Sequence, residues 1–138
     1  MDKEQTIETI LRESKTIAVV GLSDNPARPS HGVADYLKSQ GYRIIPVNPT
    51  VDEILGEKSY PDLAAVPEAV DVVEVFRRPE HVPPIAEAAV KKGARALWLQ
   101  DGVSHPAAEE MARQAGLLVV SDDCMAREHR RLRRQGRL

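Results

Sequence analysis

Residues 15–37, which read KTIAVVGLSDNPARPSHGVADYL, decide the fold class of this chain. The run at 17–20 is apolar, rich in β-branched residues and followed by Gly21. This pattern is typical of a strand that is buried on both faces of a parallel sheet. Ser30 can cap a helix with apolar residues at helical spacing, and Arg28 can pair with an anion at the start of that helix. The stretch therefore predicts a strand, an anion-binding loop and a helix.

Length and composition predict one globular domain over residues 1–138. The 138 residues are 42% hydrophobic and 29% charged, and only 4% are aromatic, so we expect a single aliphatic core region. No apolar run approaches membrane-spanning length, and the polar start lacks the features of a secretory signal. The lone Cys124 cannot form an internal disulfide, which agrees with a reducing compartment. A cytoplasmic protein without a membrane partner is expected.

Positive charge is concentrated at the C-terminus, although the net charge is −2. Residues 127–138 contain six arginines and one glutamate. This segment spans only a few helical turns and lacks interleaved aromatic residues, so it is a poor nucleic-acid site. A solvated C-terminal helix is the simpler interpretation, and nucleic acid is an unlikely partner.

Strands and helices are expected to alternate along the whole chain. Further strands are predicted at residues 42–47, 70–76, 94–99 and 117–120, and helices at 1–14, 83–92, 104–115 and 122–138. Asp2 or Thr6 can cap the first helix, Ser104 the fourth, and Asp122 or Asp123 the basic C-terminal one. Residues 48–69 are interpreted as a loop with one short helical turn at 63–66. This alternation predicts an α/β fold: a Rossmann-like, doubly wound parallel sheet of about five strands, in the order 3-2-1-4-5.

In such a sheet the ligand binds beyond the carboxyl ends of the strands, where the strand order reverses. Four loops are expected to meet there, at residues 21–30, 48–50, 76–79 and 100–104. A dinucleotide site would show G-x-G-x-x-G after the first strand and an acid after the second, where this chain has Asn48. The ATP-binding pattern G-x-x-x-x-G-K-[ST] is also absent. An NAD-type oxidoreductase domain is therefore disfavoured and is kept as an alternative.

Several guanidinium groups would converge on this crevice. Arg28 lies in the first loop, and Arg77 and Arg78 follow the third strand, while Ser23 and Ser30 supply hydroxyl groups. Coenzyme A (CoA) carries a 3′-phosphate in addition to its diphosphate, so this many arginines favour CoA over a dinucleotide. Residue types alone leave open the alternative that Arg77 and Arg78 pair with acids at the surface.

Five stretches make the chain similar to a known family. They are AVVGLSDNPARPS at 18–30, PVNP at 46–49, DVVEVFRRPE at 71–80, LWLQDGV at 97–103 and AGLLVVSDDC at 115–124. In this order they resemble the small single-domain CoA-binding proteins of the YccU-like family. That family shares its fold with the N-terminal domain of the succinyl-CoA synthetase α subunit. The resemblance extends over nearly the whole chain.

The resemblance implies that CoA or an acyl-CoA is the ligand. It implies that the loop after the first strand holds phosphate, that the residues after the second strand flank the adenosine, and that the end of the third strand lines the opposite wall. Phe76 would pack on the adenine or the ribose, or else belong to the core. The residues so implied are Gly21, Leu22, Ser23, Arg28, Pro29, Ser30, Asn48, Pro49, Thr50, Val75, Phe76, Arg77 and Arg78.

Candidates for chemistry are few. His31, His81, His105 and Cys124 are the residues considered, and they form no triad, paired-carboxylate or metal-ligand pattern. In the synthetases that resemble this chain the phosphorylated histidine belongs to a second domain, so His105 does not inherit that role. We therefore expect a CoA-binding protein that is not an enzyme on its own. The alternative is a subunit of a CoA-dependent enzyme whose partner supplies the chemistry, and a homodimer is also compatible with the sequence.

Overall fold

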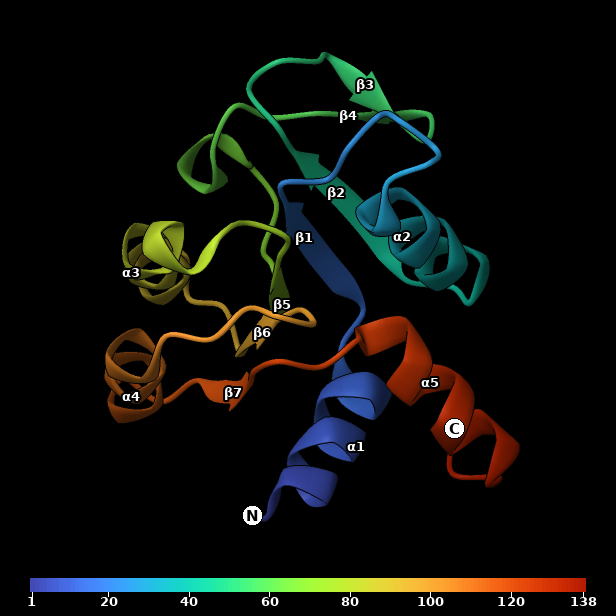
Figure 1. Cartoon of the computed structure of the whole chain (residues 1–138), viewed down its shortest axis with the longest axis vertical. Helices are drawn as coiled ribbons and strands as arrows, with labels where there is room; N and C mark the ends of the chain where they lie inside the picture. Colours follow the sequence, from blue (N-terminus) through green and yellow to red (C-terminus); the bar gives the residue numbers. More distant parts are fainter.

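Five parallel strands form one sheet in the computed structural model, which describes all 138 residues. The strands are β1 (Thr16–Val20), β2 (Arg43–Val47), β5 (Val72–Val75), β6 (Ala96–Leu99) and β7 (Leu118–Val120) (Figure 1). They lie side by side in the order β2-β1-β5-β6-β7. The predicted fold class, a single-domain Rossmann-like α/β protein with five parallel strands, is confirmed.

The place of the third sheet strand differs from the expected one. Counted in chain order, the sheet strands lie 2-1-3-4-5, whereas the order 3-2-1-4-5 would put residues 70–76 at the edge beside β2. Instead β5 pairs with β1 on one side and with β6 on the other. The outer edge of β2 is occupied by Tyr60, which bonds through its backbone to Pro46 and Asn48. Pro46 lacks an N–H group, which an edge strand tolerates.

Helices cover both faces of the sheet. One face carries α1 (Lys3–Glu13), α2 (Pro29–Ser39) and α5 (Met125–Arg134), and the other carries α3 (Val82–Lys92) and α4 (Pro106–Gln114) (Figure 1). Alternate residues of β1 supply the two cores: Ile17 and Val19 face α1, α2 and α5, while Ala18 and Val20 face α3 and α4. The sheet therefore lies between two aliphatic cores and contributes side chains to both.

Two of the predicted helix caps are displaced by proline. Asp2 caps α1 in a capping box with Gln5, as expected. Pro29 and Pro106 occupy the first positions of α2 and α4, where a missing N–H costs nothing. Arg28 and His105 are consequently the capping residues, and Ser30 and Ser104 are not.

The start of α5 and the region of residues 48–69 also differ in detail from expectation. The capping residue of α5 is Cys124 rather than Asp122 or Asp123. A small hairpin, β3 (Glu53–Ile54) and β4 (Glu57–Lys58), lies in the segment interpreted as a loop. The short helical turn expected there is present at Leu63–Ala65.

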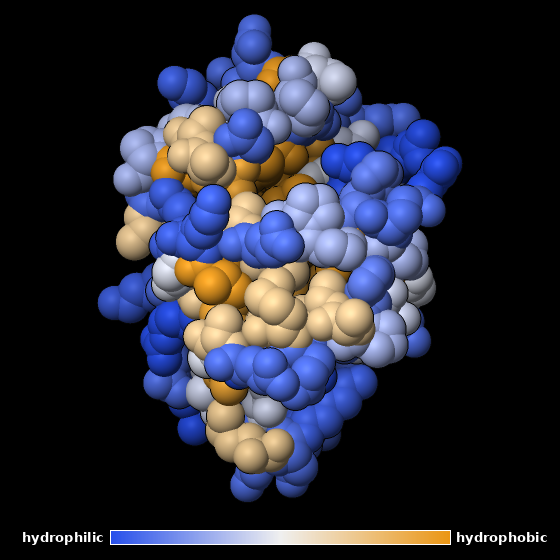
Figure 2. All heavy atoms as spheres, turned by 90° about the vertical axis from the view of Figure 1, so that its left-hand side faces the viewer, coloured by the Kyte–Doolittle hydropathy of each residue, from blue (hydrophilic) through white to orange (hydrophobic).

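Figure 2 shows both hydrophilic and hydrophobic residues on one face of the molecule. On the side covered by α3 and α4, hydrophobic residues are visible between rims of hydrophilic ones (Figure 2). The only large hydrophobic residues that are exposed are the terminal ones, Met1 and Leu138. None of the helices combines the length and the apolar composition that crossing a bilayer requires.

Candidate functional site

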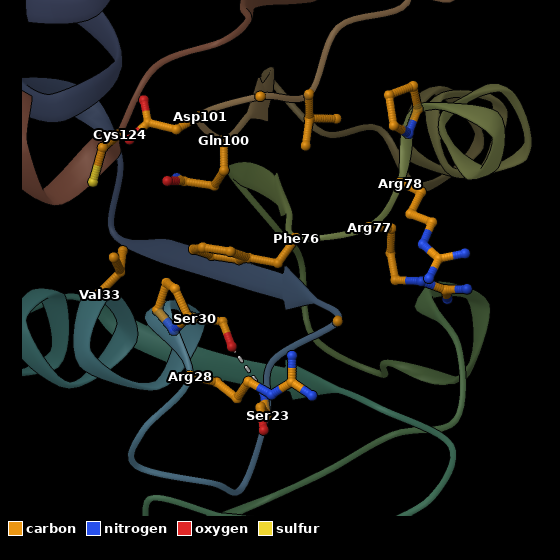
Figure 3. Close-up of a pocket in the computed structure, with 15 residues that line it drawn as sticks. Ser23, Arg28, Ser30, Val33, Phe76, Arg77, Arg78, Gln100, Asp101 and Cys124 are labelled. Carbon is orange, nitrogen blue, oxygen red and sulfur yellow. Dashed lines mark hydrogen bonds between the residues drawn. The ribbon is translucent and has the colours of Figure 1, made fainter.

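A cavity of about 690 Å³ opens at the carboxyl ends of β1, β5 and β6. The strand order reverses between β1 and β5, so this is the place where open α/β sheets bind ligands. Eight of the predicted site residues line the cavity together (Figure 3). They are Gly21, Ser23, Arg28, Pro29, Ser30, Phe76, Arg77 and Arg78.

Gly21 allows the loop after β1 to pass close to the end of β5. Its φ is +88°, and a Cβ atom there would lie 2.5 Å from the carbonyl oxygen of Phe76 and 3.0 Å from Cδ of Arg77. A real Cβ atom does not come that close to a carbonyl oxygen. Glycine is therefore required for the loop and the residues after β5 to share one cavity.

The two serines shape the first loop. The Ser30 hydroxyl accepts a hydrogen bond from the Ser23 N–H at 3.0 Å, and the Ser23 hydroxyl accepts one from the Asn25 N–H at 3.0 Å. Each hydroxyl keeps its own proton available for donation. The loop is thus ordered by its own side chains and can still donate hydrogen bonds to an anion.

Arg28, Arg77 and Arg78 bring positive charge to the cavity. None of the three forms an ion pair, whereas Arg43 and Arg131 each pair with two glutamates. All three are exposed, and they come from the loop after β1 and the loop after β5. The alternative that Arg77 and Arg78 pair with surface acids is therefore wrong, and the cavity has unbalanced positive charge.

The opposite part of the cavity is not cationic and was missing from the predicted site residues. It is formed by Val33 of α2, by residues 100–103 after β6, and by Cys124 at the start of α5. The carboxylate of Asp101 accepts two hydrogen bonds of 2.8 Å from Arg127, and these bonds lower the pKa of Asp101. The only sequence signal for this part was the expectation that residues 100–104 reach the crevice, because its side chains form no cluster of like charge.

The remaining predicted residues lie outside this cavity. The side chains of Leu22 and Val75 are completely buried in the two cores. Asn48 donates to the carbonyl of Leu22 at 2.9 Å and accepts from the N–H of Thr50 at 2.8 Å, so it ties the loop after β2 to the loop after β1. Pro49 lines a neighbouring cavity of about 240 Å³, which shares Arg77 with the larger one.

The histidines considered for chemistry do not line the cavity. His105 accepts a hydrogen bond from the N–H of Ala108 and caps α4. His31 lies in the first turn of α2, and His81 is exposed. No group of three or more potential metal ligands is found. The arrangement can hold an anion and orient a ligand, and it presents no catalytic constellation.

These features define a single-domain α/β protein with an arginine-lined cavity at the switch point of its sheet. Residues 15–130 match a family model described as "CoA binding domain", and the chain belongs to this family.

The relatives include small proteins and domains of larger enzymes. The chain is 44% identical over 123 residues to the uncharacterized protein YneT of Bacillus subtilis, a match that covers 89% of this chain and 91% of YneT. A solved structure, described as a hypothetical protein from Pyrococcus horikoshii OT3, has a TM-score of 0.91 at 40% identity and covers 95% of this chain and 92% of that one. The ADP-forming acetate–CoA ligase II of Archaeoglobus fulgidus is 32% identical over 93 residues, which cover 65% of this chain and 14% of the ligase.

Proposed function

We propose that this protein binds CoA in the cavity at the carboxyl ends of β1, β5 and β6. The observation that carries the proposal is the convergence of Arg28, Arg77 and Arg78, from two separate loops, without any acidic partner. Unpaired guanidinium groups that line one cavity favour the binding of an anion with several charges. CoA provides a diphosphate and a 3′-phosphate, and the family to which the chain belongs is described by this ligand.

The binding mode that we propose follows the two neighbouring cavities. The phosphates contact Arg28 and Arg77, together with the hydroxyl groups of the first loop. The adenosine lies toward Pro49 in the smaller cavity, because that cavity shares Arg77 with the larger one and has apolar walls. Phe76 lines the larger cavity and offers its ring to the rest of the ligand.

A role beside an enzymatic partner is the second candidate. The observation in its favour is that the match to the acetate–CoA ligase covers only 14% of that enzyme. A chain that corresponds to such a small part would supply the CoA site, and a partner would supply the chemistry. Copurification of an acyl-transferring or acyl-activating subunit with the tagged protein would support this role, and activity of the isolated chain would argue against it.

Thermal denaturation with CoA, dephospho-CoA, NAD and ATP tests the proposed ligand. A ligand that binds only the folded state adds about 2.7 kcal/mol to the free energy of unfolding at 100 times its dissociation constant. CoA should raise the melting temperature most, and dephospho-CoA should raise it less, because the latter lacks the 3′-phosphate. An equal shift with NAD or ATP would refute the argument from the number of arginines.

A further inference from the structure

A buried carboxyl group contacts Gln100 in the part of the cavity that is lined by residues 100–103. Glu74, in β5, is 0% exposed, and its sheet neighbours at the same level are Val19 and Trp98. Its Oε2 accepts a hydrogen bond from Nε2 of Gln100 at 2.5 Å, and its Oε1 has no hydrogen-bond partner. Burial without a cation raises the pKa of Glu74 to about 8, so the carboxyl group is neutral at pH 7.

Nothing in the packing of the sheet explains a carboxyl group at this position. The other residues of β5 are Val72, Val73 and Val75, and all are buried in aliphatic cores. Burying a carboxyl group with one unsatisfied oxygen costs free energy relative to an apolar side chain. The one group that gains a partner from Glu74 is the amide of Gln100.

Gln100 connects this buried pair to the cavity. It follows β6 directly, is 4% exposed and lines the cavity. Its Oε1 atom forms no hydrogen bond within the protein, since its one side-chain bond is the donation to Glu74. In Figure 3 the amide of Gln100 reaches into the cavity on the side of Cys124, with the ring of Phe76 between it and Arg28. The cavity thus has a cationic part and, across Phe76, a part with a free hydrogen-bond acceptor.

We propose that Gln100 recognises the pantetheine arm of CoA and that Glu74 is the positioning residue that holds its amide. The inference rests on the proposed function, because it takes the arginine part of the cavity as the phosphate site. An arm that leaves the phosphates and crosses Phe76 reaches Gln100. The pantetheine arm carries amide N–H groups and a thiol, and these are the donors that an unpartnered carbonyl oxygen requires. A neutral Glu74 holds the amide of Gln100 without adding a negative charge next to the cavity, in which an anionic ligand would bind.

Isothermal titration with two ligands separates arm recognition from phosphate binding. CoA carries both parts, and adenosine 3′,5′-bisphosphate carries phosphates without the arm. Gln100→Leu should weaken CoA binding by about 5- to 10-fold, as expected for the loss of one neutral hydrogen bond, and leave the bisphosphate affinity unchanged within about twofold. The matched control is Gln114→Leu, an exposed glutamine of α4, which should change neither affinity.

The role of Glu74 is tested by a double-mutant cycle. Glu74→Leu removes the unsatisfied carboxyl oxygen but also frees the N–H of Gln100, which can rotate toward the cavity, so the variant should fold and lose CoA affinity as Gln100→Leu does. The double variant should lose no more than either single variant, because both changes act through the same amide. Glu74→Gln should retain the wild-type affinity within about twofold, since a neutral amide at position 74 can still accept from Gln100.

The outcomes distinguish this inference from the proposed function. If the wild-type protein fails to bind CoA, the proposed function is wrong and the inference falls with it. If the wild-type protein binds CoA but Gln100→Leu binds it equally well, or loses both ligands to the same extent, the proposed function stands and arm recognition by Gln100 is refuted. If the effects of Glu74→Leu and Gln100→Leu add, Glu74 does not act through Gln100.

Discussion

Arg28 is the guanidinium group closest in sequence to the glycine turn, and its contribution can be measured directly. It is exposed, lines the cavity and has no acidic partner. Replacing it by alanine should weaken CoA binding by roughly 1.5 to 3 kcal/mol, the range for a hydrogen bond to a charged group. Titration calorimetry at fixed ionic strength is the measurement, because salt screens such contacts.

The control for Arg28→Ala is Arg134→Ala. Arg134 is also exposed and unpaired, and it lies on α5 in a separate cluster with Tyr36. The two variants lose the same charge, so a long-range electrostatic effect would weaken CoA binding in both. Unchanged affinity in Arg28→Ala would remove this residue from the site.

Gly21 is needed both for the backbone conformation of the first loop and for the shape of the cavity. Gly21→Ala should destabilise the protein by about 1–3 kcal/mol or more, because alanine is strained at a positive φ and its Cβ meets the carbonyl of Phe76. Gly32→Ala is the matched control: Gly32 lies within α2, and an added Cβ meets nothing within 4 Å. This control should gain about 0.4–1 kcal/mol. Urea denaturation measures both, and similar stabilities for the two variants would contradict the close approach at Gly21.

Because of the buried Glu74, we expect the free energy of unfolding to fall as the pH rises. An ion-paired carboxylate would have the opposite effect. Its pKa is about 8 in the folded state and near its ordinary value of 4.5 in the unfolded state. Between these values the folded state holds one more proton, so the free energy of unfolding should fall by up to about 1.4 kcal/mol per pH unit as the pH rises. Above about pH 8 this contribution is lost. Glu74→Gln should remove it, and equal pH slopes for the variant and the wild type would show that Glu74 is not the cause.

At the scale of elements, α5 is held to its neighbours by a histidine and by ion pairs. His129 is buried, its Nδ1 lies 2.8 Å from the hydroxyl of Tyr36 in α2, and its ring meets those of Tyr36 and Tyr42 edge-on. Arg131 and Arg137 pair with Glu4 of α1. Much of the arginine-rich segment is therefore engaged within the protein, which agrees with a structural role for this segment.

His129 should make the docking of α5 sensitive to acid. Burial lowers the pKa of His129, and the neighbouring Arg133 and Arg130 lower it further, so the folded state favours the neutral ring. Below the ordinary pKa of 6.5 the unfolded state binds more protons, and the stability from His129 should decline as the pH falls through that value. Denaturation of the wild type and of His129→Gln at about pH 5.5 and pH 7.5 measures this. A wild-type protein that loses no more stability than the variant would rule out His129 as the titrating group.

The sequence predicted the main helices and sheet strands because local patterns determine them. The runs around Ile17 and Val73 are apolar and β-branched, and helix ends coincide with signals such as Asp2 and Gly93. The hairpin at Glu53–Ile54 was missed because two-residue strands are too short to show an alternating pattern. Caps were misplaced where a proline fixed the first helical position.

At the scale of the whole molecule, the order of the strands could not be derived from such local patterns. Whether residues 70–76 lie beside β2 or beside β1 depends on what else covers the edge of β2, and Tyr60 does so from a segment with weak signals. The residues of the candidate site likewise divide into those that a local pattern predicts and those that it does not. Charged residues such as Arg77 were predicted from their type. The loop that begins at Gln100 was expected at the crevice, but Gln100 itself and Val33 were recognised as lining residues only in the three-dimensional arrangement.

The shared sheet predicts that the whole molecule unfolds in one transition. Both cores include alternate residues of the same strands, packed against helix residues. The single tryptophan, Trp98, is completely buried, and its indole N–H donates to the carbonyl of Asp123 at 2.9 Å. Trp98 fluorescence and far-ultraviolet circular dichroism should therefore show the same urea midpoint, because neither layer of helices can leave the sheet without exposing a core. An earlier loss of helical signal would mean that one layer melts separately. CoA should move both midpoints together, since the cavity is built from loops after β1, β5 and β6 and from the start of α5.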